Sequence, residues 1–313
     1  MICVQATTLE KMNSVNYSVS IFDQLRVRSL VLWFVFGLVI VIVAASILTL
    51  DFGDPLEELL LFGFMTIWPL FWLWLKLNKV GVTWRAFIGR LPNQRSWIRW
   101  IIITMGVLVF SIGCIFLLWY PLSFVSPRLV ESLLLSESPY LFNDGTPTPF
   151  PLLAIEFIYV IILAPFAEEL IFRGIVLQRW ATKWGIRKGI VLSSLVFGIL
   201  HLDPIGGVFF GFVMAILYIR SRTLLVPIFC HAVNNAVAYF LEGIDFWITG
   251  PIVPSIDEFR SVVWIGVVCL VLTVPWAIFF VARNWPGEES QIIYSPEPVT
   301  AQDVEIVARP PRQ

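Results

Sequence analysis

Long apolar stretches dominate the sequence, and most of them are long enough to cross a lipid bilayer. A membrane-spanning helix needs roughly 20 consecutive, mostly apolar residues. Of the 313 residues, 58% are hydrophobic and only 14% are charged, whereas about a quarter of the residues in soluble domains are charged. We therefore expect an all-α, polytopic membrane protein with about eight transmembrane helices. The predicted spans are Ser29–Leu50, Leu59–Leu75, Ile101–Trp119, Leu152–Leu177, Ile190–Leu202, Gly206–Ile219, Leu224–Leu241 and Ser261–Ala282.

The distribution of basic residues predicts how these helices are oriented. All but three of the 21 Lys and Arg residues fall in the two tails or in alternate loops. The exceptions are Arg128 and Arg260 in the opposite set of loops, and Arg173 inside the fourth span. Because cytoplasmic loops of membrane proteins are enriched in Lys and Arg, we expect both termini to lie in the cytoplasm. In a bacterium, the protein would then reside in the plasma or inner membrane.

Composition also bounds the domain organisation and the classes of partner. We expect a cytoplasmic N-terminal tail over residues 1–28, a transmembrane domain over residues 29–283 and a disordered, proline-rich and acidic cytoplasmic tail over residues 284–313. A net charge of -1 and scattered basic residues argue against nucleic acid as a partner. The four cysteines match no zinc or disulfide spacing.

Three acidic residues fall within apolar spans, and all of them lie in the fourth. An ionisable side chain at the bilayer centre is costly, so such residues usually face a protein interior or a wet cavity. Glu156 lies near the end of its span, where its side chain can reach the headgroups. Glu168 and Glu169 lie too deep for that. Because Glu169 and Arg173 are four residues apart, we expect them to form an ion pair that leaves Glu168 without an intrahelical partner.

Both histidines of the chain and an asparagine lie in the spans that follow. His201 shares a helix face with Phe197, and His231 with Asn235, because each pair is four residues apart. At 1.5 Å per residue, Glu168, His201, His231 and Asn235 lie about 14–20 Å from the cytoplasmic ends of their spans. We therefore expect these four side chains to meet in one cavity inside the membrane. There, Glu168 could act as a general base, and an amide and a histidine could stabilise an oxyanion.

These residues resemble the signature motifs of the CPBP intramembrane proteases, which include the type II CAAX prenyl endopeptidases (the Ras-converting enzyme group) and the bacterial Abi relatives. The resemblance covers residues 151–241 and implies an eight-helix fold, an active site inside the membrane and endopeptidase chemistry. The motifs stand here as Glu168-Glu169-x-x-x-Arg173, Phe197-x-x-x-His201 and His231-x-x-x-Asn235.

The resemblance also implies a role for each motif residue. Glu168 with His201 would activate a water, and His231 and Asn235 would hold the developing oxyanion. This chemistry needs no cofactor. In the alternative, metalloprotease interpretation, zinc would be bound by Glu168, His201 and His231, which is a chemically reasonable set of ligands. The remaining motif residues would support the site: Glu169, Arg173 and Phe197.

The expected partners are membrane lipid and a peptide or protein substrate, with a prenylated CAAX-like peptide as one candidate. Other intramembrane protease classes fit poorly, because the sequence has no His-Glu-x-x-His zinc motif, no Gly-x-Ser-x-Gly and no aspartate deep in a span. The alternative class is a non-catalytic membrane protein of the same fold, either an ion-coupled transporter or a bacteriocin-immunity or scaffold factor. The absence of internal repeats and the common depth of the polar residues favour the protease.

Overall fold

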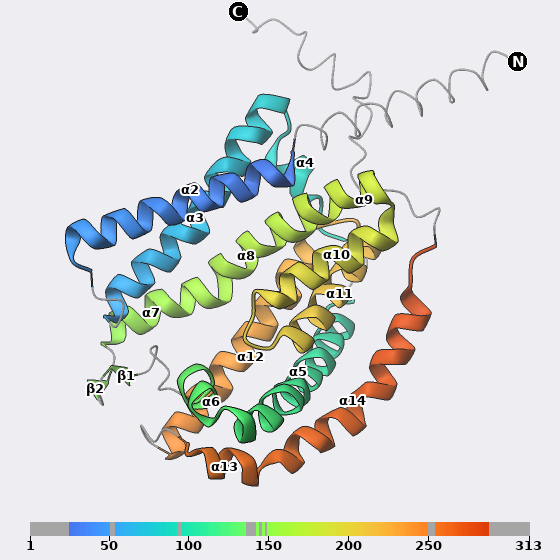
Figure 1. Ribbon diagram of the computed structural model, residues 1–313. Coiled ribbons are helices and arrows are strands. Elements are labelled where there is room, and N and C mark those ends of the chain that lie inside the picture. The colour runs from blue at the N-terminus through green and yellow to red at the C-terminus, as the bar shows by residue number, and fades with distance from the viewer. Residues whose placement is uncertain are drawn as a thin grey trace, which may run out of the picture.

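A computed structural model of the chain describes residues 25–50, 54–92, 96–135, 142–143, 146–147, 149–249 and 254–287, and these residues are almost entirely helical (Figure 1). Seven helices in these ranges are long and apolar enough to cross a membrane. The all-α, polytopic class predicted from the sequence is therefore confirmed. Of the two predicted tails, residues 1–24 and 288–313 lie outside the described residues.

The helices follow one another with short connections, and one pair of two-residue strands interrupts them. Phe142 pairs with Pro147 and Asn143 with Thr146 in this antiparallel pair. In chain order the elements are α2 (Val27–Leu48), α3 (Pro55–Val80), α4 (Trp84–Ile88), α5 (Trp97–Val125), α6 (Pro127–Leu133), β1 (Phe142–Asn143), β2 (Thr146–Pro147), α7 (Phe150–Ile158), η1 (Tyr159–Leu163), α8 (Ala164–Glu169), η2 (Leu170–Leu177), α9 (Gln178–Trp184), α10 (Ile186–Ile199), α11 (Pro204–Ser221), α12 (Leu225–Thr249), α13 (Ile256–Ser261) and α14 (Val263–Asn284).

Helices α2 and α3 form an antiparallel pair that is fastened by two tryptophans. The Trp33 and Trp68 rings stack with centroids 4.6 Å apart. Each indole N–H donates to the backbone carbonyl of the other residue, at 3.0 Å and 2.8 Å. The start of α3 is fixed by Asp54, whose carboxylate accepts from the first backbone N–H groups of the helix. Both indole N–H groups thus have partners within the helix pair, which is necessary because lipid chains offer no hydrogen-bond acceptors.

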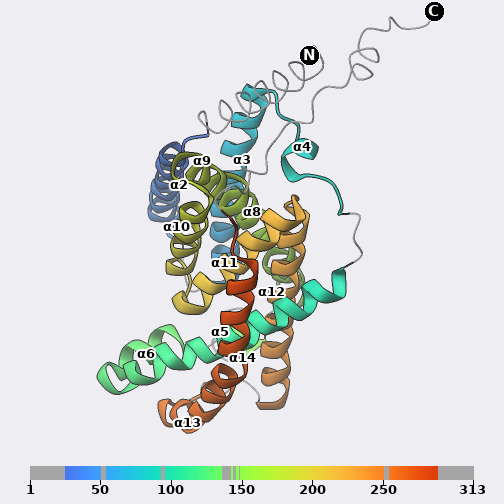
Figure 2. The ribbon, with the colours of Figure 1, turned by 90° about the vertical axis from the view of Figure 1, so that its right-hand side faces the viewer.

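Helix α5 crosses the molecule and packs against α11, α12 and α14 (Figure 2). Close approach of α5 and α14 depends on small residues, because a Cβ atom added at Gly113 would lie 2.7 Å from Leu270 and one added at Gly266 would lie 2.4 Å from Phe116. The Trp119 indole of α5 donates to the Leu202 carbonyl in the turn after α10, at 3.1 Å. This hydrogen bond anchors the α10–α11 turn to α5.

The fifth predicted span, Ile190–Leu202, differs from what the structure contains. It corresponds to α10, which has 14 residues and ends at Ile199. At 1.5 Å per residue this helix is about 21 Å long, which is shorter than the roughly 30 Å hydrocarbon core. Helix α10 instead forms a hairpin with α11, in which Gly198 lies against Val208 and Gly211 against Ser194. The predicted segment and the observed helix are thus nearly equal in length, but the helix begins and ends earlier, and the hairpin returns the chain to the side from which α10 starts.

The fourth span is longer than predicted and includes two π-helical segments. It runs without a break from Phe150 to Trp184, over 35 residues, whereas the sequence predicted Leu152–Leu177. The segments η1 and η2 flank the short α8, which ends with the two adjacent glutamates. A π-helical segment changes the direction in which the following side chains point, and such segments are frequent at functional sites. Gly185, with φ +89°, then separates this span from α10.

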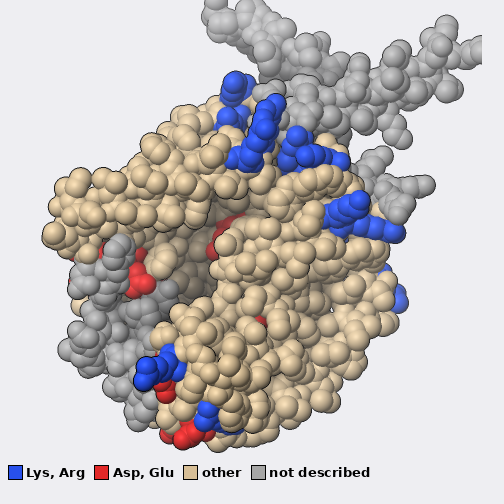
Figure 3. Space-filling model, in the orientation of Figure 1, with Lys and Arg blue, Asp and Glu red and all other residues tan. Residues whose placement is uncertain are grey.

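The outer surface has the charge pattern of a membrane protein. Uncharged side chains cover most of the middle of the molecule, and Lys and Arg gather at the end where α4 and α9 lie (Figure 3). The outward faces of the helices are apolar, with residues such as Leu32, Ile47 and Ile98 more than two-thirds exposed. In water such a surface would be unfavourable, but it is the surface that lipid chains require.

Candidate active site

The acidic pair of the fourth span points in two directions, as predicted. Glu169 is fully buried, and its Oε1 lies 2.8 Å from Nη1 of Arg173, four residues later. The other terminal nitrogen of Arg173, Nη2, donates to the Gly211 carbonyl of α11 at 3.2 Å. Glu168 is turned away from this pair, and its side chain is 34% exposed. The predicted ion pair is present, and it also ties the fourth span to α11.

Glu169 has a second partner that the sequence did not predict. Its Oε1 also lies 2.9 Å from Nδ1 of His231 on α12. Because a carboxylate only accepts hydrogen bonds, Nδ1 of His231 carries the proton and donates. One buried carboxylate oxygen therefore holds a guanidinium from its own helix and an imidazole from another. The opposite ring nitrogen of His231, Nε2, is left facing Glu168.

Glu168 lies midway between the two histidines. Its Oε2 is 3.9 Å from Nε2 of His201 and 3.9 Å from Nε2 of His231. These distances are too long for direct hydrogen bonds and leave room for a bridging water. Among the described residues, Oε2 of Glu168 is buried without a hydrogen-bond partner. Three of the four predicted site residues are thus brought together around one carboxylate oxygen.

The sequence placed His201 within the fifth span, but in the structure it lies in the turn that follows α10. Its Nδ1 is 2.7 Å from the Phe197 carbonyl, which can only accept, so Nδ1 donates and Nε2 is free to accept. The Phe197 ring stacks on the imidazole at 4.4 Å, and the Arg173 guanidinium lies 4.5 Å from the centroid of the same ring. Phe197 therefore holds His201 in place through both its backbone and its ring.

The fourth predicted residue, Asn235, takes a less direct position. It lies one turn beyond His231 on α12, and its amide nitrogen donates to the Val160 carbonyl in η1 at 3.0 Å. This bond uses one of the two amide N–H groups. A π-helical turn shifts the register of backbone hydrogen bonds, and here the Val160 carbonyl receives a side-chain donor. Asn235 thus connects α12 to the fourth span beside the site.

The site opens to the outside of the protein. Figure 3 shows a deep hollow between the α2–α3 side of the molecule and the α10–α11 hairpin, with acidic atoms visible inside it. His201 is 40% exposed and Glu168 34% exposed, whereas Glu169, Arg173 and His231 are each at least 95% buried. The arrangement therefore combines an accessible acid–histidine pair with a buried layer that orients it.

The zinc alternative depends on whether the donor atoms lie close enough together to share one ion. Within the described ranges, no group of three His, Cys, Asp or Glu side chains is placed to hold a metal ion. The candidates Glu168, His201 and His231 have suitable donor atoms, but the 3.9 Å separations exceed the roughly 3.3 Å edge of a tetrahedral zinc site with bonds near 2.0–2.1 Å. In this arrangement, the three side chains do not fit a zinc ion.

Two further residues contact the site without having been predicted from the sequence. The Gly211 carbonyl accepts from Arg173, and the Phe210 ring packs edge-on against His231 at 4.7 Å. Both belong to α11, which has no ionisable residue near this level. A backbone carbonyl and an ordinary aromatic residue leave no distinctive pattern in a sequence. Only the packing of α11 against the fourth span identifies them.

Comparisons with known proteins locate the same part of the chain. Residues 150–237, which include every residue of the three motifs, match the family model described as Rce1-like, type II CAAX prenyl endopeptidase. A curated protein of Bacillus subtilis (strain 168) named "Putative membrane peptidase YdiL" is 33% identical over 84 residues. That similarity covers 26% of this chain and 34% of the relative, so the chain spans about a third of the length of the curated protein it matches. No solved structure shows a significant match.

The matched region coincides with the part of the fold that carries the site, from α7 to the middle of α12. The helices before and after it are outside the family match. Over residues 150–237 the comparisons therefore confirm the resemblance that the three motifs predict, which is to the Rce1-like type II CAAX prenyl endopeptidases.

Proposed function

We propose that the protein is an intramembrane endopeptidase in which Glu168 and His201 activate a water for attack on a peptide bond. The observation that carries this proposal is the position of the Glu168 carboxylate, 3.9 Å from Nε2 of both His201 and His231. A water between these groups could donate to the carboxylate and to an imidazole at once. The family match over residues 150–237 supports a protease.

In the proposed mechanism, Glu168 takes a proton from the water as general base. Neutral His201 assists because its Nδ1 donates to the Phe197 carbonyl, so its Nε2 is the accepting nitrogen. The hydroxide attacks the substrate carbonyl carbon, and negative charge develops on the carbonyl oxygen. Protonated Glu168 then delivers its proton to the leaving amine, which completes hydrolysis.

The oxyanion would be stabilised by His231 and Asn235. The bond from Nδ1 to the Glu169 carboxylate, at 2.9 Å, orients the His231 ring, and Nε2–H would donate to the oxyanion when the ring carries both protons. Asn235 keeps a second amide N–H beyond the one given to Val160. Two such donors aimed at the developing charge lower the barrier without involving a cofactor.

We further propose that the basic end of the molecule faces the cytoplasm, with both termini on that side. The gathering of Lys and Arg at this end supports that orientation (Figure 3). The substrate is proposed to be a membrane-associated peptide or protein, and a prenylated CAAX-like peptide is the first candidate because of the family match. A lipid-modified substrate could reach the hollow laterally from the bilayer.

The proposed mechanism is tested with Glu168→Gln and a matched control, Glu156→Gln. Both residues are carboxylates of the fourth span, but Glu156 is 12 positions earlier and lies outside the site. Reconstituted protein is assayed on a prenylated CAAX peptide and on a library of membrane peptides. We expect Glu168→Gln to cleave about 100–10,000 times more slowly, as loss of a general base predicts, with Glu156→Gln close to wild type.

Two outcomes would overturn the assignment. Equal cleavage by wild type and Glu168→Gln would remove Glu168 from the mechanism. No cleavage of either substrate class by folded wild type would favour the non-catalytic alternative. A strong chelator is added in a separate arm, and loss of activity that zinc restores would support a metal site in place of the metal-free mechanism.

A further inference from the structure

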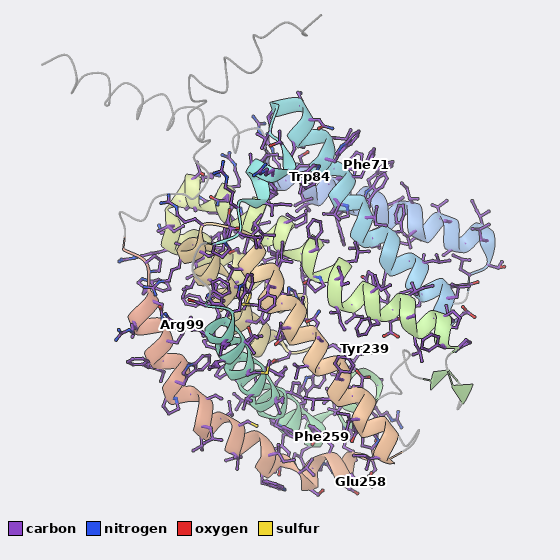
Figure 4. The ribbon with its side chains drawn as sticks, turned by 180° about the vertical axis from the view of Figure 1, so that it is seen from behind. Phe71, Trp84, Arg99, Tyr239, Glu258 and Phe259 are labelled. Carbon is purple, nitrogen blue, oxygen red and sulfur yellow. The ribbon has the colours of Figure 1, made fainter. Side chains whose placement is uncertain are left out.

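A second cavity, of about 340 Å³, lies at the basic end of the molecule and shares no residue with the candidate active site. Three helices surround it, namely the first turns of α5, the last turns of α11 and the end of α14. Figure 4 labels Arg99 on the first turn of α5, beside the ribbon of α14. The cavity therefore lies where the spans end and the headgroups of a bilayer begin.

The charged side chains of this cavity are both arginines. Arg99 from α5 and Arg220 from α11 line it, and none of the lining residues is acidic. Both arginines are exposed, and no carboxylate of the described residues forms an ion pair with either. Two guanidinium groups beside one cavity repel each other unless an anion lies between them. An anion with several oxygens can accept hydrogen bonds from both guanidinium groups.

The start of α5 adds to the same preference. Ser96 is the N-cap residue of this 29-residue helix, and its side chain makes no capping hydrogen bond. The first turn contains no acidic residue, so in the described part of the chain neither the N-cap side chain nor a first-turn carboxylate accepts from the free backbone N–H groups. Because the N-terminal end of a helix carries partial positive charge, it favours a bound anion. Ser96 and Arg99 both line the cavity.

The rest of the lining is mixed, as an amphiphile requires: Ser96, Ser221 and Asn284 contribute polar groups beside apolar side chains. Trp100, Leu217 and Phe280 line the cavity and are each more than 90% buried in the bundle. Free phosphate would contact only the polar groups, whereas a lipid headgroup with its glycerol would contact both kinds of side chain. Basic pockets between transmembrane helices on the cytoplasmic side are suited to anionic headgroups.

We propose that this cavity is a binding site for the phosphate-bearing headgroup of an anionic phospholipid. Arg99 and Arg220 bind the phosphate oxygens together with the first backbone N–H groups of α5. The glycerol end of the lipid packs against Trp100 and Phe280. Since the cavity joins α5, α11 and α14, a bound lipid also fixes the α14 end to the bundle that carries the candidate active site.

The test measures thermal unfolding of the full chain in detergent with three additions: phosphatidylglycerol, phosphatidylcholine with the same acyl chains, and inorganic phosphate. We expect phosphatidylglycerol to raise the unfolding temperature well above the other two. The double variant Arg99→Gln/Arg220→Gln should bind phosphatidylglycerol at least tenfold more weakly in a titration, because two headgroup contacts are lost. Its unfolding temperature without lipid should match wild type, because both side chains are exposed.

The matched control is Arg85→Gln/Lys188→Gln, which removes two exposed basic residues near the same end but outside the cavity. This control should bind phosphatidylglycerol as wild type does. Equal binding by the cavity variant and wild type would overturn the proposal. An equal effect of inorganic phosphate would show an anion site without lipid specificity, and an equal effect of phosphatidylcholine would exclude selection of the anionic headgroup. Because the readout is lipid binding, failure here is separable from failure of the proposed protease activity.

Discussion

Removing the Arg173 guanidinium tests the buried layer that orients the candidate active site. We expect Arg173→Met to lower the free energy of unfolding by about 3–5 kcal/mol, because it leaves the charge of Glu169 buried and uncompensated. The upper part of this range is expected here. The guanidinium also donates to the Gly211 carbonyl at 3.2 Å and lies 4.5 Å from the centroid of the Phe197 ring, so several contacts are lost together.

A double-mutant cycle separates the ion pair from the other contacts of Arg173. Glu169→Gln alone should also destabilise the protein, because it leaves an unpaired buried guanidinium. The double variant Glu169→Gln/Arg173→Met buries no net charge, so its loss should fall short of the sum of the single losses by about 2–3 kcal/mol. Cleavage should nevertheless stay about 100-fold low, because Nδ1 of His231 loses the ionised acceptor that orients its ring.

The free energy of unfolding is measured by titration with sodium dodecyl sulfate in mixed micelles, followed by tryptophan fluorescence. Cleavage of the best substrate is measured on the same preparations. Additive losses in the cycle would contradict direct coupling of Glu169 and Arg173. Wild-type stability of Arg173→Met would refute the whole electrostatic argument. Recovery of cleavage in the double variant would show that the bond from His231 to Glu169 has no part in the reaction.

Two further predictions concern the hairpin that carries the turn with His201. Gly198→Ala should destabilise the protein by about 1–3 kcal/mol or more and reduce cleavage, because its Cβ would lie 2.4 Å from the backbone nitrogen of Val208. The control is Gly63→Ala, because a Cβ at that position meets nothing within 4 Å. Equal unfolding curves for the two variants would contradict the packing argument. Asp203→Ala should lower the free energy of unfolding by about 1 kcal/mol, because the Asp203 carboxylate caps α11 by accepting from the backbone N–H of Gly206 at 2.9 Å. Unfolding in urea or detergent measures this loss, and an unchanged midpoint would exclude a capping role.

The local part of the site could be predicted from the sequence. Glu169 and Arg173 are four residues apart on one helix, so their ion pair depends on helix geometry alone. The common depth of Glu168, His201 and His231 followed from counting residues along spans that are anchored by basic loops. Their approach around one carboxylate oxygen agrees with that count.

The parts that were missed depend on how separate helices are rotated against each other. The bond from His231 to Glu169 joins residues 62 positions apart, and no spacing rule fixes the rotation of α12. Likewise, Asn235 reaches the Val160 carbonyl because η1 is a π-helical segment, which hydropathy cannot distinguish from an ordinary helix. The fifth span was placed a few residues too late, because an apolar run does not mark the residue at which a helix begins or ends. The Leu200–Asp203 turn ends α10 well before a full crossing.

The shared oxygen of Glu169 has a consequence for the order in which the protein is built. Ribosomes release the fourth span before α12, so Glu169 enters the membrane with Arg173 on the same helix and four residues away. The carboxylate is thus neutralised before its second partner has been synthesised, and the segment can insert without an isolated charge. His231 arrives later and takes the same oxygen. The same carboxylate oxygen therefore takes part first in insertion of the nascent chain and later in assembly of the candidate active site.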